Sequence, residues 1–195
     1  MDQQILASLS APRLSTYLTA RAFDPVLAKQ LYLWNAEVGA AFHLPIQALE
    51  VVLRNHIVGI LRHQFGAAWW ENVDFIYSLN KHRRAALQKT VQRKAINIPE
   101  LDEGRIISML SFGFWVNLMD EWQPVAFAND LRWARSSIAK VCYLRNRIFH
   151  HEPIFKRDLL ADYGLIMKLL YQLCPATHNW IRPHCRVPAL VRQKP

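Results

Sequence analysis

Cysteine and long apolar runs are scarce in this chain of 195 residues. The three cysteines, Cys142, Cys174 and Cys185, form an odd and scattered set, which argues against a disulfide framework and fits a reducing compartment. No run of about 18 uninterrupted apolar residues is present, so we expect no transmembrane helix. The first residues lack the basic and apolar regions of a signal peptide. The sequence therefore predicts a cytoplasmic protein.

Strict alternation of apolar and polar residues is also missing, and so are internal repeats and low-complexity segments. Hydrophobic residues make up 52% of the chain and charged residues 20%, which is typical of a globular domain and not of a disordered chain. We predict an all-α fold, a compact helical bundle. It would form a single domain over residues 1–180, followed by a basic, proline-containing and loosely ordered tail over residues 181–195.

Prolines and the helical spacing of apolar residues predict where the helices lie, because proline favours the first turn of a helix. We expect helices to open at Pro12, at Pro25 with Asp24 as its N-cap, and at Pro45, with Gly66 ending the third. Further helices are predicted for the basic stretch before Pro99, for residues 103–110, for a short segment before Pro124, for a long stretch carrying Leu131 to Ile148, and for residues 156–173. Pro153 would end or kink the long helix.

Positive charge is in excess, with a net charge of +9 and a pI near 9.8. A basic surface favours polyanions such as RNA, DNA or an anionic membrane face, although an unrelated basic protein has the same composition. One segment concentrates this charge and could bind phosphates. Alternatively, its basic side chains form a solvated helix face. Its basic residues are Lys81, Arg83, Arg84, Lys89, Arg93 and Lys94.

The stretch from Arg145 to Pro153 carries the residue types that metal-independent RNA cleavage needs. Histidine titrates in the range required to move the proton of a 2′-hydroxyl or of the leaving oxygen, and His150 and His151 lie side by side. Arginine stabilises charge on a phosphorane through bidentate hydrogen bonds, a role open to Arg145. The stretch therefore supplies both chemical functions.

Helix geometry constrains such a site. Arg145 and His150 are five residues apart, which is roughly 140° of rotation on an ideal helix, so they would not share a face. A working site then needs a distorted helix end or groups from two protomers. The structural alternative is that Arg145 pairs with Glu152 and that the two histidines are cations favoured at a helix C-terminus.

Resemblance to a known family favours the functional interpretation. Arg145-Asn146-x3-His150 resembles the Arg-x4–6-His signature of the HEPN superfamily, in which a polar residue commonly follows the arginine. The longer segment LRNRIFHHEPIF resembles the Abi-like, or abortive-infection-like, branch of that superfamily. Two further blocks, residues 31–57 and 109–118, resemble the same branch, and the three blocks in order span most of residues 10–175.

The resemblance implies a HEPN-like helical bundle with additional N-terminal helices. Such proteins form homodimers in which two Arg/His motifs face one cleft, and the active ones are metal-independent endoribonucleases that leave a 2′,3′-cyclic phosphate and a 5′-hydroxyl. Many act as toxins or phage-defence effectors, so an antitoxin or modifying partner is a further expectation. Arg145 would stabilise the transition state, Asn146 would position this arginine or the phosphate, and His150, or alternatively His151, would act as acid/base. The competing hypothesis is a non-catalytic, RNA- or partner-binding dimeric module.

Other polar and aromatic residues have weaker patterns. Glu50, Arg54, Asn55 and Arg147 are candidates for a wall of the cleft, although Glu50 and Arg54 could instead form a helix-surface ion pair. Tryptophans 69, 70, 115 and 122 could stack on bases, but large aromatics at helical spacing usually pack inward. Cys174, His178, His184 and Cys185 match no common zinc spacing, so we predict no metal and no cofactor.

Overall fold

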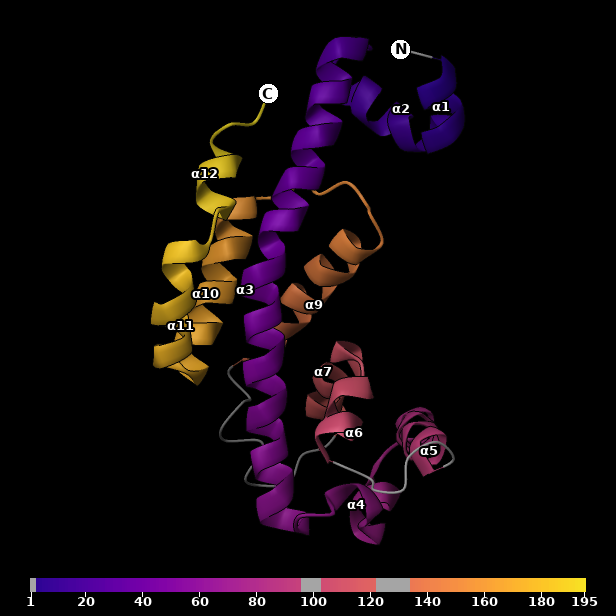
Figure 1. Ribbon diagram of the computed structural model, residues 1–195, viewed down its shortest axis with the longest axis vertical. Helices are drawn as coiled ribbons and strands as arrows, with labels where there is room; N and C mark the ends of the chain where they lie inside the picture. Colours follow the sequence, from indigo (N-terminus) through magenta and orange to yellow (C-terminus); the bar gives the residue numbers. More distant parts are fainter. Residues whose placement is uncertain (1–2, 96–102, 122–133) are drawn as a thin grey trace. The chain divides into compact units, whose positions relative to one another are not determined.

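The computed structural model describes residues 3–95, 103–121 and 134–195, and the regular structure within these ranges is entirely helical (Figure 1). The predicted all-α class is confirmed. The chain forms two compact units, which we call the first unit (Met1–Ala48 with Tyr143–Pro195) and the second unit (Leu49–Cys142). Each is described by itself below. Whether residues 1–180 form the single domain expected from the sequence therefore stays a prediction.

Three helices open the chain; the starts of the second and third follow the sequence pattern, whereas the first was not predicted. They are α1 (Gln3–Leu9), α2 (Ala11–Ala20) and α3 (Pro25–Phe65). Proline lies in the first turn of α2, as expected. The Asp24 Oδ1 accepts hydrogen bonds from the backbone N–H groups of Val26 and Leu27, at 2.8 and 3.0 Å, so the predicted N-cap is confirmed.

The helix start predicted at Pro45 is wrong, because α3 runs without a break from Pro25 to Phe65. A proline inside a helix removes one backbone hydrogen bond and costs about 3 kcal/mol. Phe42 and Ile46, on either side of Pro45, are 0% and 1% exposed. Burial of each contributes about 1.5–3 kcal/mol, which offsets the cost of the proline. The predicted end is confirmed, since Gly66 follows with a φ of 87°.

Length and apolar composition also make α3 the one helix among the described residues that could in principle cross a membrane. The core helix of a globular unit has the same properties. In the first unit Leu31, Val38 and Phe42 of α3 are at most 1% exposed and pack inside the protein. The expected cytoplasmic location stays a prediction.

The C-terminal part of the first unit contains α9 (Arg135–Phe149, of which the residues from Tyr143 belong here), α10 (Leu159–Leu173), α11 (Pro175–Ile181), η2 (Arg182–His184) and α12 (Val187–Val191). Helix α10 begins at Leu159, later than the expected residue 156, because the Asp158 side chain caps it by accepting a bond from the Ala161 N–H. Figure 1 shows α11 beside α10 and the short α12 near one end of α10, and both pack against it.

The loosely ordered tail predicted for residues 181–195 is therefore wrong. Ile181, Val187 and Leu190 are buried, and the Trp34 Nε1–H donates to the carbonyl of Leu190 at 2.8 Å. The prolines suggested a broken chain, but Pro183 and Pro188 lie in the first turns of η2 and α12, where proline is tolerated. Short helices and apolar anchors order this segment.

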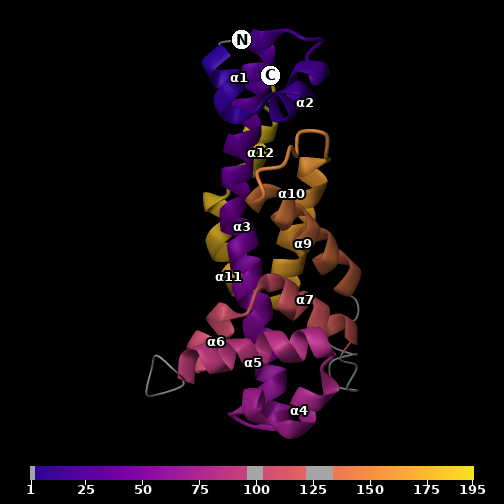
Figure 2. The same ribbon diagram turned by 90° about the vertical axis from the view of Figure 1, so that its right-hand side faces the viewer.

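The second unit contains η1 (Trp69–Glu71), α4 (Val73–Ser78), α5 (Lys81–Ala95), α6 (Glu103–Met109) and α7 (Phe112–Glu121). Figure 2 shows α5 beside α6, against which it packs. Trp69, Trp70 and Trp115 are 0%, 8% and 1% exposed and stack edge-on around Trp69, so these three are core residues and not base-stacking platforms. The predictions on Trp122, Pro124 and Leu131 lie outside the described residues.

Candidate functional site

The C-terminal end of α9 closes in a Schellman turn that reverses the chain before Pro153. The carbonyl of Arg147 accepts a bond from the N–H of Glu152 at 2.8 Å, and the carbonyl of Ile148 accepts one from the N–H of His151 at 3.0 Å. His151 adopts a φ of 57°, in the left-handed region that glycine usually occupies at this position. The end of the helix is therefore distorted at the histidine pair, which was one of the two arrangements that the sequence required.

Arg145 lies against the ring of Phe149, one helical turn further along α9. The guanidinium carbon is 4.3 Å from the ring centroid, within the range of a cation–π contact. Its Nη1 donates to the Asn146 Oδ1 at 3.3 Å, a contact that fits the role expected of Asn146. Phe149 in turn lies 5.7 Å from the ring of His43 on α3. The arginine is thus held next to an aromatic surface.

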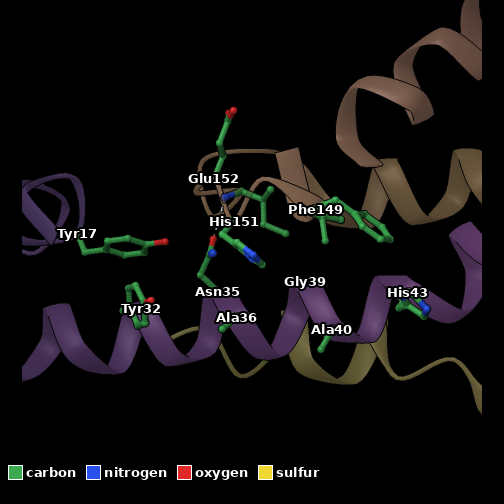
Figure 3. Close-up of a pocket in the computed structure, with 12 residues that line it drawn as sticks. Tyr17, Tyr32, Asn35, Ala36, Gly39, Ala40, His43, Phe149, His151 and Glu152 are labelled. Atoms are coloured by element: carbon green, nitrogen blue, oxygen red, sulfur yellow. Dashed lines mark hydrogen bonds between the residues drawn. The ribbon is translucent and has the colours of Figure 1, made fainter. Parts of the chain in front are cut away.

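A pocket of about 650 Å³ in the first unit includes Phe149 and His151 in its lining (Figure 3). The His151 side chain points toward α3, whereas the Glu152 side chain points away from it. His150 is exposed and does not line this pocket. Of the two candidate histidines, only His151 therefore lines the same pocket as Phe149, whose ring contacts Arg145. The lining residues are Tyr17, Tyr32, Asn35, Ala36, Gly39, Ala40, His43, Ile148, Phe149, His151, Glu152 and Ile154.

Asn35 of α3 fixes the segment that follows His151. Its Oδ1 accepts bonds from the backbone N–H groups of Ile154 at 2.8 Å and Phe155 at 3.1 Å, and its side chain is buried. From the other side, the Arg13 Nη1 donates to the carbonyl of His151 at 2.6 Å. The sequence analysis missed both residues, although an asparagine next to the apolar stripe of α3 was a signal that a buried polar group needs partners.

Tyr17 of α2 also contributes to this pocket. Burial and the neighbouring Tyr32 raise the pKa of Tyr17 to about 12, so the phenol stays protonated at neutral pH and can donate a hydrogen bond. In Figure 3 its hydroxyl points toward Asn35 and His151. Its ring is held by Tyr32 and Phe155, each with its centroid 5.2 Å away.

Cations surround the other side of the turn. In place of the alternative pairing with Arg145, Glu152 forms an ion pair with Arg147 at 3.1 Å, and Arg147 also donates to the carbonyl of Pro153 at 2.8 Å. Hydrogen bonding to Asp162 raises the pKa of Arg157 and fixes its guanidinium at 2.7 Å. A second cavity of about 390 Å³ is lined by Thr16, Arg147, Pro153, Lys156 and Arg157.

The remaining candidates belong to the second unit, so their place in one cleft with Arg145 stays a prediction. Arg84 donates to the carbonyls of Ile76, Tyr77 and Leu79 at 3.0–3.1 Å, which makes it a structural cap of the α4 end rather than a phosphate ligand. Lys81 and Asn55 are exposed, whereas Glu50, Arg54 and Arg83 are half-buried. Of the basic segment, the side chains of Arg93 and Lys94 lie outside the described residues.

The cysteines and histidines near the C-terminus make local contacts. Cys174 contacts the Thr177 hydroxyl at 3.1 Å, which lowers the pKa of the thiol, and burial raises the pKa of Cys185. His178 contacts the Asn179 side chain at 2.9 Å. Within the described ranges, no three His, Cys, Asp or Glu side chains gather as a metal site would require.

Comparison with protein-family models, with curated proteins and with solved structures finds no match to this chain. The HEPN resemblance therefore stays an expectation. The functional argument below depends on the geometry of the chain's own residues.

The left-handed backbone of His151 predicts a stabilising substitution. Glycine adopts this conformation without the strain of a Cβ, so His151→Gly should raise the free energy of unfolding by about 0.5–1 kcal/mol in urea denaturation. His150→Gly, at the preceding residue without a positive φ, should lower it. Destabilisation by His151→Gly would show that the imidazole itself supports the turn.

Proposed function

We propose that the protein is a metal-independent endoribonuclease in which Arg145 and His151 act on the same phosphate. The observation that carries this proposal is that Phe149 contacts Arg145 and lines the same pocket as His151. The spacing Arg145-x5-His151 also lies within the Arg-x4–6-His pattern that the chain resembles.

The chemistry follows from these two side chains. Neutral His151 takes the proton of a ribose 2′-hydroxyl, and the 2′ oxygen attacks the adjacent phosphorus. Arg145 stabilises the negative charge that develops on the non-bridging oxygens, held in place by Asn146 and Phe149. The P–O5′ bond breaks, and the leaving oxygen takes a proton from the imidazolium of His151 in a second copy of the chain. The products are a 2′,3′-cyclic phosphate and a 5′-hydroxyl.

Charge around the turn supports RNA as the partner. Residues 145–157 contain four arginine or lysine side chains and a single carboxylate, and the whole chain carries a net charge of +9. Lys156 is exposed at the cavity that it shares with Arg147 and Arg157, where phosphates of the RNA chain would find cations. Only RNA supplies the 2′-hydroxyl nucleophile, so DNA would bind without being cut.

The biological setting is also a proposal. The resemblance to Abi-like proteins implies a homodimer that acts as a toxin or phage-defence effector, held in check by an antitoxin or a modifying partner, and the sequence pattern suggests a cytoplasmic location. A dimer suits the chemistry, because one imidazole must accept a proton while another donates one.

A cleavage assay with the purified protein tests the proposal. The protein is incubated in buffer containing EDTA with an RNA oligonucleotide and, separately, with a DNA oligonucleotide of the same sequence. We expect cleavage of RNA alone. Salt-sensitive binding of both strands with no cleavage of either would contradict the nuclease and favour the non-catalytic RNA-binding module.

A further inference from the structure

We infer that the pocket beside His151 binds one nucleobase of the RNA, the base of the nucleotide whose 2′-hydroxyl attacks, and that it prefers the keto bases uracil and guanine over the amino bases cytosine and adenine. This inference rests on the proposed function and adds to it a substrate preference. The volume of about 650 Å³ lies in the usual range of ligand pockets.

The shape of the pocket suits a flat aromatic ligand. Its α3 side is made of Ala36, Gly39 and Ala40, whose small side chains leave the space open (Figure 3). Aromatic rings stand at both ends, with Tyr17 and Tyr32 at one end and Phe149 and His43 at the other. Base–aromatic stacking contributes about 1–3 kcal/mol per base, so these rings offer the attraction that a nucleobase needs.

Two polar side chains of the pocket indicate which functional groups a ligand would need. Tyr17 is 2% exposed and Asn35 is 8% exposed, yet both line the pocket. Within the described part of the chain the Tyr17 hydroxyl has no hydrogen-bond partner, and Asn35 uses its Oδ1 for Ile154 and Phe155 while its NH2 group donates to nothing. Both groups keep contact with the open pocket, where a bound ligand could accept their hydrogen bonds.

The hydrogen-bond donor character of these two groups determines which bases the pocket would prefer. The raised pKa of Tyr17 keeps its phenol protonated, and the amide NH2 of Asn35 can only donate, so the pocket presents hydrogen-bond donors. Uracil and guanine offer a carbonyl oxygen as acceptor at the ring position where cytosine and adenine carry an amino group. At that position adenine and cytosine carry an exocyclic amino group, itself a donor, which would face a donor of the pocket and leave it unpaired.

His151 links the pocket to the reaction. Its imidazole lies in the pocket wall, and Arg145 stacks on Phe149 at the end formed by that ring. A base held between the rings would therefore place its own ribose beside the imidazole and its 3′-phosphate toward the guanidinium. Cleavage is then expected on the 3′ side of uridine or guanosine.

Binding of 3′-mononucleotides, measured by NMR titration, tests the pocket without requiring cleavage. We expect uridine and guanosine 3′-monophosphates to bind about tenfold more tightly than adenosine 3′-monophosphate, the effect of one hydrogen bond. Tyr17→Phe removes only the hydroxyl and should weaken uridine monophosphate binding about five- to tenfold. Ala36→Leu and Ala40→Leu fill the pocket from exposed helical positions and should abolish binding.

Matched controls are Tyr171→Phe and Ala161→Leu, at exposed positions of α10 outside the pocket lining, and both should bind as the wild type does. Circular dichroism checks the fold of each variant. The inference is overturned if no nucleotide binds, if adenosine monophosphate binds equally well, or if the filled variants still bind. Wild-type RNA cleavage is measured in parallel: cleavage without nucleotide binding overturns the pocket alone, whereas binding without cleavage supports the pocket and overturns the nuclease.

Discussion

Replacing Arg145 or His151 by alanine is expected to lower the rate of RNA cleavage by about 10²–10⁴-fold. A positioned acid or base contributes a factor of this size, and so does one preorganised donor to a charged transition state. Neither side chain belongs to the apolar core, since Arg145 is half-buried and His151 is exposed, so both variants should keep the fold. The measurement is the single-turnover rate on an end-labelled RNA oligonucleotide, with thermal melting to verify the fold.

Two surface variants serve as controls for these substitutions. His184→Ala and Arg192→Ala remove the same side-chain types at exposed C-terminal positions that do not line the pocket, and both should cut at the wild-type rate. The structure also ranks the two neighbouring histidines, because only His151 lines the pocket with Phe149. His150→Ala should therefore lose less activity than His151→Ala, and the reverse order would reassign the acid/base to His150.

Asn35→Ala is expected to lower the free energy of unfolding by about 2–6 kcal/mol. It deprives the backbone N–H groups of Ile154 and Phe155 of their acceptor, and each buried donor left unpaired costs about 1–3 kcal/mol. Both residues are buried, at 1% and 4% exposure, so water cannot replace the lost carbonyl oxygen without opening the segment. Urea denaturation followed by circular dichroism measures the change.

Two further variants make this test specific. Asn35→Asp keeps an oxygen at the same place and should recover much of the lost stability, because a carboxylate accepts bonds from two N–H groups well. Asn179→Ala, at an exposed position of α11, should change the stability by less than about 0.5 kcal/mol. A loss below about 1 kcal/mol in Asn35→Ala would mean that Asn35 does not hold the segment after His151.

Local signals in the sequence predicted most of the helices. Asp24 before Pro25 and Gly66 after Phe65 gave both ends of α3, since capping depends on residues adjacent in the chain. The helix start predicted at Pro45 was wrong because it depends on tertiary burial and not on adjacent residues. Whether a proline breaks a helix depends on how deeply its neighbours are buried, and the burial of Phe42 and Ile46 is a property of the folded unit.

The candidate site was predictable in part. Residue types alone drew attention to the Arg145–Pro153 stretch, but ideal helix geometry could not choose between His150 and His151. The choice depends on the left-handed backbone of His151, which turns its side chain toward α3. Arg13, Tyr17 and Asn35 escaped prediction because they meet the stretch only through folding, more than 100 residues away along the chain. Arg84 was a candidate for phosphate binding or for a solvated helix face, yet its Nε and Nη2 groups donate to carbonyls of α4 and of the residue after it.

The chemistry of the RNA ends tests the central claim most directly. Products formed in EDTA by the wild type and by His151→Ala are mapped for a 2′,3′-cyclic phosphate and a 5′-hydroxyl. We predict that the wild type leaves both groups and that the variant leaves neither above background. Wild-type products ending in a 3′-hydroxyl and 5′-phosphate, or undiminished cyclic phosphate from His151→Ala, would contradict cleavage by this guanidinium and imidazole.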